Sequence, residues 1–296
     1  MASFDDYVLV SQFPEQPVER MIAAFRGWPD AGDAATATLN YMLTALGAQK
    51  FAEIDPEEFF NFAQERPRST RSKDGIRHLQ WPANEFYLWP GSDDAPPVVF
   101  YLGTEPHLKW RTFSSLVGDL ARQCGVKSVV HIGALLDAVP HTRVTKFSGT
   151  STNQRIQAAF DRANVRTSNY QGPSGITLPV SESLAARGIS YTSLWGHVSH
   201  YLHATPNFRV GLGLAQNVSD MLGLPIDLGK LTVMAEAFDR EVEKVIADDD
   251  QLGQYIITLE EKYDAAVDAT EMPDPADLVR DLERFLRAER MGGSES

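Results

Sequence analysis

The sequence predicts an α/β protein in which helices flank a mostly parallel sheet, followed by a helical extension toward the C-terminus. Short apolar runs alternate with segments of helical period up to Pro225, which is the pattern of strands covered by helices. Turn residues mark the junctions between predicted strands and helices. Beyond Pro225 the apolar residues recur only at spacings of three and four, as in amphipathic helices. We therefore expect an α/β core at 1–229, an acidic helical extension at 230–291 and a flexible tail at 292–296.

The individual elements follow from these patterns. Seven short apolar runs bounded by turn residues predict strands at 21–25, 50–54, 75–81, 85–89, 98–102, 128–132 and 190–195. Segments of helical period predict helices at 34–46, 110–124, 153–163, 181–187 and 207–222. The extension begins with a helical pair that is broken at ADDDQLG. If the core strands are parallel, the loops after them meet along one edge of the sheet.

The composition excludes several classes of protein. The chain has 296 residues, of which 43% are hydrophobic and 23% charged, as in soluble globular proteins. A net charge of −13 disfavours general nucleic-acid binding, which needs a dense Lys and Arg surface. No apolar run approaches the roughly 18 residues that cross a bilayer, and the first residues, MASFDDYVLV, are acidic where a signal peptide is basic. We expect a cytoplasmic protein that binds neither membrane nor nucleic acid.

The stretch IAAFRGWPDAGD at 22–33 joins a predicted strand to a helix and carries charges and an indole. One interpretation is a tight turn in which Asp33 caps the following helix. The other is an anion site formed by Arg26 and the free amides at the helix N-terminus. Asp30 and Asp33 would repel an anion unless one served as a cap or paired with Arg26. No G-x-G-x-x-G or P-loop spacing is present, so we expect no nucleotide cofactor, nor any other.

A second group of charges follows the strand VVFYLG, in GTEPHLKWRTF. Glu105 lies two residues from His107, a spacing that suits either an acid–base pair or a salt-linked surface turn. Neither Ser174 nor Ser199 lies in the G-x-S-x-G motif of a hydrolase nucleophile.

Histidines form the remaining candidates. His131 alternates with apolar neighbours in a predicted strand, so we expect a hydrogen-bonded core residue. His197, His200 and His203 recur every three residues, which would suit a metal on a helix. Gly196 precedes them, Pro206 follows, and no Asp, Glu or Cys pattern accompanies them. We therefore expect no metal site.

Taken together, the motifs resemble one known family. RGWPDAGDAA, LGTEPHLKW, HIGALLDAVPHTR, GPSGI and SLWGHVSHYL occur in an order and at separations similar to the bacterial branch of the proteasome assembly chaperone two family, and particularly its long actinobacterial members. The resemblance implies a core similar to the purine nucleoside phosphorylase and hydrolase-like fold, a homo-oligomer such as a trimer, and a link to the 20S proteasome. It carries over no catalytic residues.

Two functional hypotheses remain open. The first is a non-enzymatic oligomeric chaperone or adaptor, in which Trp28 is an interface anchor surrounded by Arg26, Asp30 and Asp33. The acidic helices would then clasp a neighbouring subunit, meet a basic partner, or merely face solvent.

The alternative is a phosphorylase- or hydrolase-like enzyme that acts on a small anionic or nucleoside-like substrate. Its pocket would lie at the carboxyl edge of the sheet, where Arg26, Asp30, Glu105 and Arg143 would converge.

Overall fold

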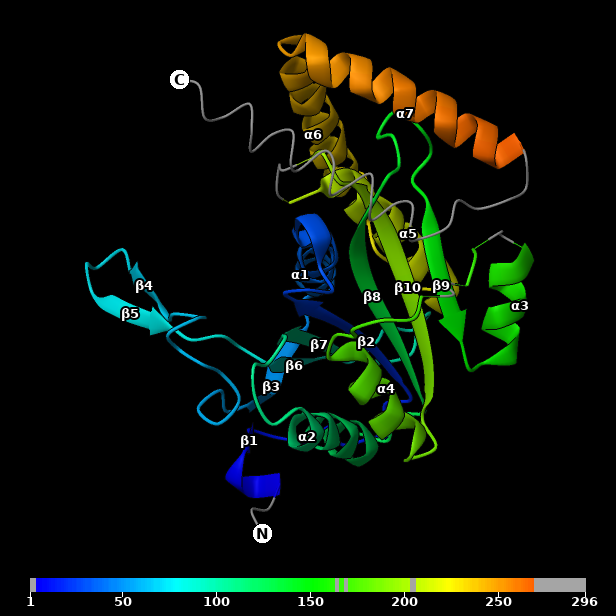
Figure 1. Ribbon diagram of the computed structural model, residues 1–296. Helices are drawn as coiled ribbons and strands as arrows, with labels where there is room; N and C mark the ends of the chain where they lie inside the picture. The colour runs from blue at the N-terminus through cyan, green and yellow to red at the C-terminus, as the bar shows by residue number, and fades with distance from the viewer. Residues whose placement is uncertain (1–3, 163–164, 168–169, 203–205, 269–296) are drawn as a thin grey trace.

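A mixed sheet of eight strands forms the centre of the protein. The computed structural model describes residues 4–162, 165–167, 170–202 and 206–268. The strand order is β1-β3-β6-β7-β2-β8-β10-β9 (Figure 1). The four strands β7, β2, β8 and β10 are parallel, whereas β9 at one side and β6, β3 and β1 at the other are antiparallel to their neighbours. The predicted α/β fold with a helix-flanked sheet is confirmed, and its parallel part is this four-stranded centre.

The elements lie close to their predicted positions. The strands are β1 Val8–Val10, β2 Arg20–Arg26, β3 Gln49–Ile54, β4 Arg68–Arg71, β5 Arg77–Gln80, β6 Glu85–Trp89, β7 Val98–Thr104, β8 Ser128–Asp137, β9 Phe147–Ser151 and β10 Ser190–Ser199. The helices are α1 Ala34–Leu46, α2 Trp110–Gln123, α3 Gln154–Arg162, α4 Thr177–Ala185, α5 Phe208–Leu222, α6 Gly229–Ala247 and α7 Asp250–Asp268, with short 3-10 turns at Phe4–Asp6 and Ala31–Asp33.

The run predicted as a core strand at 75–81 does not join the main sheet, which corrects that prediction. It forms β5, which pairs only with β4 in a separate hairpin that projects from the body (Figure 1). Every residue of both strands is exposed. Gly75 has a φ of 81° in the connecting turn, a backbone conformation that glycine adopts without strain. The apolar residues of this run therefore face solvent instead of the core.

Helices cover both faces of the sheet, and β2 shows how the sequence divides between them. Met21, Ala23 and Phe25 belong to the core cluster under α2 and α4. Ile22 and Ala24 belong to the cluster under α1 and α5. Because successive strand residues point to opposite faces, an entirely apolar strand supplies both cores, as is usual in the centre of an α/β sheet.

The predicted C-terminal helical pair is present as α6 and α7. Leu231, Ala235 and Val242 of α6 are buried, and α6 packs along α5. Ile256 and Leu259 of α7 pack on Tyr201 just after β10. Neither helix is long and apolar enough to cross a membrane, and the same holds for every other helix in the described part of the chain. The rest of the predicted extension, 269–291, and the predicted tail, 292–296, lie outside the described residues.

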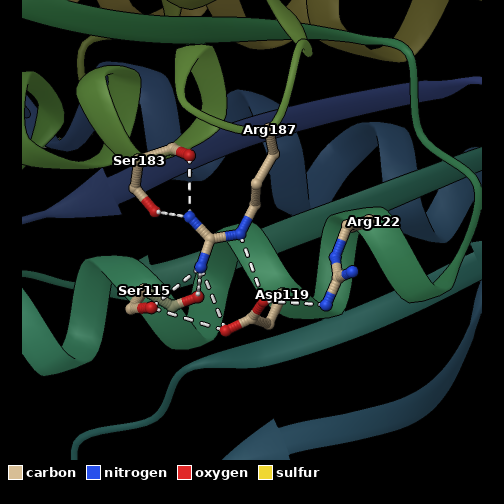
Figure 2. Close-up of polar contacts among 5 residues, drawn as sticks. All are labelled: Ser115, Asp119, Arg122, Ser183 and Arg187. Atoms are coloured by element: carbon tan, nitrogen blue, oxygen red, sulfur yellow. Dashed lines mark hydrogen bonds and ion pairs between the residues drawn. The ribbon is translucent and has the colours of Figure 1, made fainter.

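An arginine ties α4 to α2 (Figure 2). The Arg187 guanidinium donates to Asp119 Oδ1 at 3.1 Å, to Ser183 Oγ at 2.8 Å and to Ser115 Oγ at 2.8 Å. Desolvation opposes ionisation of Asp119, but the Arg187 hydrogen bond and charge lower the pKa of this carboxyl below its usual value. Gly118 makes the close approach possible, since a Cβ there would lie 2.6 Å from Ser183 Oγ.

His131 is buried as predicted, yet it is not hydrogen-bonded, which corrects that part of the prediction. Within the described residues neither ring nitrogen has a hydrogen-bond partner, and the ring lies among Phe25, Tyr191 and Trp195. Burial lowers the pKa of His131 from 6.5 to about 3. The imidazole therefore acts as a neutral aromatic ring in the core.

Replacing Arg187 tests the link between α2 and α4. Arg187→Ala leaves Asp119 and two serines without their shared donor, so we expect the free energy of unfolding to fall by about 2 kcal/mol. Arg122→Ala is the control, because its side chain is 64% exposed and makes a single 3.3 Å contact with Asp119; we expect about 0.5 kcal/mol or less. Urea denaturation measures both, and equal losses would contradict the assignment.

Replacing His131 tests its protonation state. The unfolded chain takes up a proton below the ordinary pKa of 6.5, whereas the folded protein does so only near 3. Lowering the pH below 6.5 should therefore destabilise the wild-type protein relative to His131→Phe. The loss approaches ~1.4 kcal/mol per pH unit, or about 2 kcal/mol between pH 6.5 and pH 5. Urea titrations at several pH values measure this. A constant difference for His131→Phe would mean that burial does not lower the pKa of His131.

Candidate functional site

The loop from β2 to α1 is held by a buried carboxylate. Asp30 Oδ1 accepts from Ala35 N at 2.7 Å, and Oδ2 accepts from the Thr36 hydroxyl. Burial raises the pKa of Asp30 to about 6, although the hydrogen bonds from Thr36 and Ala35 oppose this shift. Asp33, predicted as the cap, has a left-handed φ of 49° and its side chain makes no capping bond. Asp30 therefore replaces Asp33 as the cap of α1, since the 3-10 turn at Ala31–Asp33 lets the chain reverse before the helix begins.

Glu105, at the end of β7, links this loop to two others. Its backbone N–H donates to Arg26 O at 2.9 Å. Its carboxylate accepts from Trp28 N at 3.3 Å and from Ile176 N at 2.8 Å. One carboxylate thus joins the loops after β2 and β7 to the GPSGI segment before α4. Hydrogen bonds from backbone amides to an ionised acceptor are stronger than neutral ones, so the three segments form one rigid rim.

The Trp28 side chain stands out from this rim with 62% of its surface exposed. A Cβ added to Gly175 would lie 2.9 Å from Trp28 Cε3 and 2.9 Å from Glu105 Oε1. The indole therefore rests against the bare backbone of Gly175, and a larger residue there would displace the Trp28 or Glu105 side chain. Pro29 O accepts from Ala134 N of β8 at 2.9 Å, which fixes the loop on its other side. A large aromatic side chain is thus held in solvent by a backbone that is fixed at several points.

The remaining predicted site residues separate into two groups. Arg26 is exposed at the end of β2, beside Glu105, and Asp33 is half-buried at the start of α1. Arg143 lies elsewhere, in the loop after β8, and its guanidinium contacts Asp264 Oδ2 of α7 at 2.7 Å and Glu260 Oε1 at 3.3 Å. Arg143 therefore fastens α7 to the core and does not join the rim.

The contacts among the described residues do not gather the four residues of the enzyme hypothesis, because Arg143 contacts α7 whereas Asp30 and Glu105 bond the loop after β2. A shallow pocket beside α5 and α6 contains Arg143, Lys146, His197 and Arg209, but none of Arg26, Asp30 and Glu105. Each of its cations is near a carboxylate of the chain: Arg209 pairs with Asp239 and Lys146 with Asp137. The Asp30 carboxylate is occupied by the helix cap. This geometry gives no support to an anion pocket at the predicted position.

One polar constellation was missed by the motif search. Asp137 Oδ2 lies 2.6 Å from His197 Nδ1, and His197 Nε2 lies 2.9 Å from Ser148 Oγ. Burial alone would raise the pKa of Asp137, but His197 and Lys146 hold it well below its usual range. The order of groups matches the Ser-His-Asp relay of hydrolases.

The relay is nevertheless placed like a structural network. Ser148 is buried within the paired strand β9 and does not line the neighbouring pocket. The three residues join the adjacent strands β8, β10 and β9. Only the register of these strands brings them together, so no local motif could have revealed the set.

The three histidines of the predicted series do not lie on one helix. His197 is in β10 and His200 follows the strand, so the helical spacing that would have suited a metal is absent there. His200 Nδ1 lies 3.1 Å from Asp137 O, and its Nε2 lies 2.9 Å from Tyr255 Oη of α7. His203 lies outside the described residues. Across the described residues, no group of three potential ligands is arranged to hold a metal ion.

Comparison with known proteins places the chain. A PAC2 family protein from Streptomyces avermitilis is 31% identical with a TM-score of 0.71, over 80% of this chain and 99% of that one. A proteasome-assembly chaperone homologue from Mycobacterium tuberculosis is 34% identical with a TM-score of 0.70, over the same shares. A second Mycobacterium tuberculosis protein, of unknown function, is 25% identical with a TM-score of 0.78, over 89% of this chain and 92% of its own.

No curated protein matches the chain. The model of the PAC2 family matches residues 24–246, a span that contains β2, the Trp28 loop, Glu105 and all of α6. The resemblance predicted from the motifs is confirmed, and this chain belongs to the PAC2 family.

Proposed function

We propose that this protein is a non-enzymatic chaperone or adaptor that uses the Trp28 rim to bind proteasome subunits. In this proposal it acts in the cytoplasm as a homo-oligomer, with a trimer as the expected assembly. The core at 1–229 carries the partner surface, and the acidic extension at 230–291 serves assembly. Family membership and the similarity to a proteasome-assembly chaperone homologue support the choice of partner.

The observation that carries the proposal is the rigid presentation of Trp28. Aromatic side chains dominate binding hot spots because they bury a large area with few rotatable bonds. Here the indole is 62% exposed, and its own backbone N–H is held by Glu105. A preorganised loop loses little conformational entropy when a partner covers it. Exposing a large indole in this way is costly in solubility, which a partner surface would explain.

The surroundings of Trp28 suit a protein partner. Leu178, at the start of α4, is 51% exposed, and its backbone N–H donates to Gly175 O, beneath the indole. Arg26 is exposed at the end of the same loop. An apolar centre with a charged rim is the common anatomy of a protein interface. The enzyme alternative has no comparable observation in its favour, because its four residues form no common pocket.

Substitution of Trp28 tests the proposal. Tagged full-length protein, purified from its native organism at low salt, should recover proteasome subunits. We expect Trp28→Ala to weaken this binding about 30-fold, because loss of a hot-spot residue costs about 2 kcal/mol or more. Quantitative mass spectrometry of the co-purified proteins measures the loss.

Val144→Ala is the matched control, since Val144 is an exposed apolar residue in the loop after β8, away from the rim contacts. We expect it to retain wild-type recovery, and both variants to keep the wild-type melting temperature. Wild-type recovery by Trp28→Ala would remove the rim from the function. Proteasome subunits missing even from the wild-type sample would remove the partner.

A further inference from the structure

The hairpin formed by β4 and β5 is an exposed basic arm on an acidic protein. The basic arm, residues 66–81, contains five Arg or Lys and one Asp, a net charge of +4 in a chain whose total is −13. All five cations are exposed: Arg66, Arg68, Arg71, Lys73 and Arg77. Among the ion pairs between described residues, none includes any of them. No ion pair within the described part of the chain therefore compensates the positive charge of the arm.

The register of the arm places two of these cations on the same face. Arg71 lies directly opposite Arg77, and Ser69 lies opposite Leu79. Like charges directly opposite in a hairpin are destabilising, and a two-stranded hairpin alone is only marginally stable in water. Side chains two residues apart point to the same face, so Arg71, Arg77 and Leu79 share it. Leu79 is 61% exposed. An anionic surface with apolar residues would relieve the repulsion and cover Leu79.

The C-terminal helices of the same chain present such a surface. Residues 229–268 contain eleven Asp or Glu and four Lys or Arg, a net charge of −7. Met234, Glu241, Val245 and Asp248 are all exposed. Their spacings of seven, four and three residues place them on one side of α6 and its C-cap, with Lys230 before them and Lys244 beside them. This acidic stripe combines two carboxylates with two apolar side chains, as the arm combines two guanidinium groups with Leu79.

We propose that the basic arm of one copy docks on the acidic stripe of α6 in a second copy of this chain. The arm projects from the side of the molecule, whereas α6 and α7 form its top in the same view (Figure 1). Two different surfaces that meet between identical subunits make a head-to-tail contact, which closes into a ring when the rotation permits. The inference rests on the homo-oligomer of the proposed function, and not on the outside partner or on Trp28.

Charge reversal on each side, and on both together, tests the contact. Sedimentation velocity of the full-length protein at about 50 mM and about 500 mM salt measures assembly, and we expect salt to weaken it because exposed charges are screened. Arg71→Glu with Arg77→Glu should weaken assembly about tenfold or more, and Glu241→Lys with Asp248→Lys should do the same. The chain that carries all four changes should assemble again, because an acidic arm then faces a basic stripe and the opposite charges attract as before.

The controls separate this contact from folding and from the proposed function. The four residues are exposed, so each variant should keep the wild-type melting temperature. Glu236→Lys with Glu243→Lys is the matched control, because it makes the same change of charge on another side of α6. A wild-type monomer at low salt, or a fourfold variant that stays dissociated, would overturn the proposal. The proposal would also be overturned if the arm variant assembled like the wild type but lost bound nucleic acid, because the arm would then bind a different anion. Recovery of proteasome subunits through Trp28 is read out independently.

Discussion

The rim of this protein depends on one carboxylate that three chain segments share. Glu105 accepts the backbone N–H groups of Trp28 and Ile176, while its own N–H is bonded to Arg26 O. Without it, the loop before α1 and the segment before α4 would present unpaired amides to each other, which costs free energy unless water replaces the acceptor. Glycine at 175 completes the arrangement, because no Cβ fits between Trp28 and Glu105. The exposed indole is thus a property of the fold and not of a mobile side chain.

The sheet topology decides which loops can meet this carboxylate. β2, β7, β8 and β10 are parallel, so their carboxyl ends point toward one edge, and the loops after β2 and β7 meet at Glu105. β3 and β6 are antiparallel to each other, and the segment that connects them leaves the sheet and includes the basic arm. β8 continues to Asp137, beyond its pairing with β2. Its following loop therefore delivers Arg143 to α7 instead of the rim.

The sequence was sufficient where local pattern and long-range packing agree. The strand and helix periods located the helices and most strands, although they missed the short strands β1, β4 and β9. The ordered motifs identified the family. The sequence was insufficient where the outcome depends on contacts between residues that lie far apart or on the exact backbone path. Position in the sequence favoured Asp33 as the cap of α1, whereas the chain reversal at Ala31–Asp33 gives that role to Asp30. The run at 75–81 has strand-like residues, but apolar content does not specify which sheet a strand joins. Ser148, Asp137 and His197 are neighbours through register alone.

In the proposed function, two kinds of surface would serve two kinds of recognition. The Trp28 rim is small, apolar at its centre and fixed by backbone hydrogen bonds, so it suits a partner that must be bound specifically and released without rearrangement. The arm and the acidic stripe are charged and exposed, which favours fast, salt-sensitive encounters over tight burial. The packing of α6 on α5, together with the ion pair between Arg209 and Asp239, gives the stripe a fixed position relative to the sheet. A ring joined through arms and stripes would then repeat the rim once per subunit, so that weak contacts at each Trp28 add through multivalency.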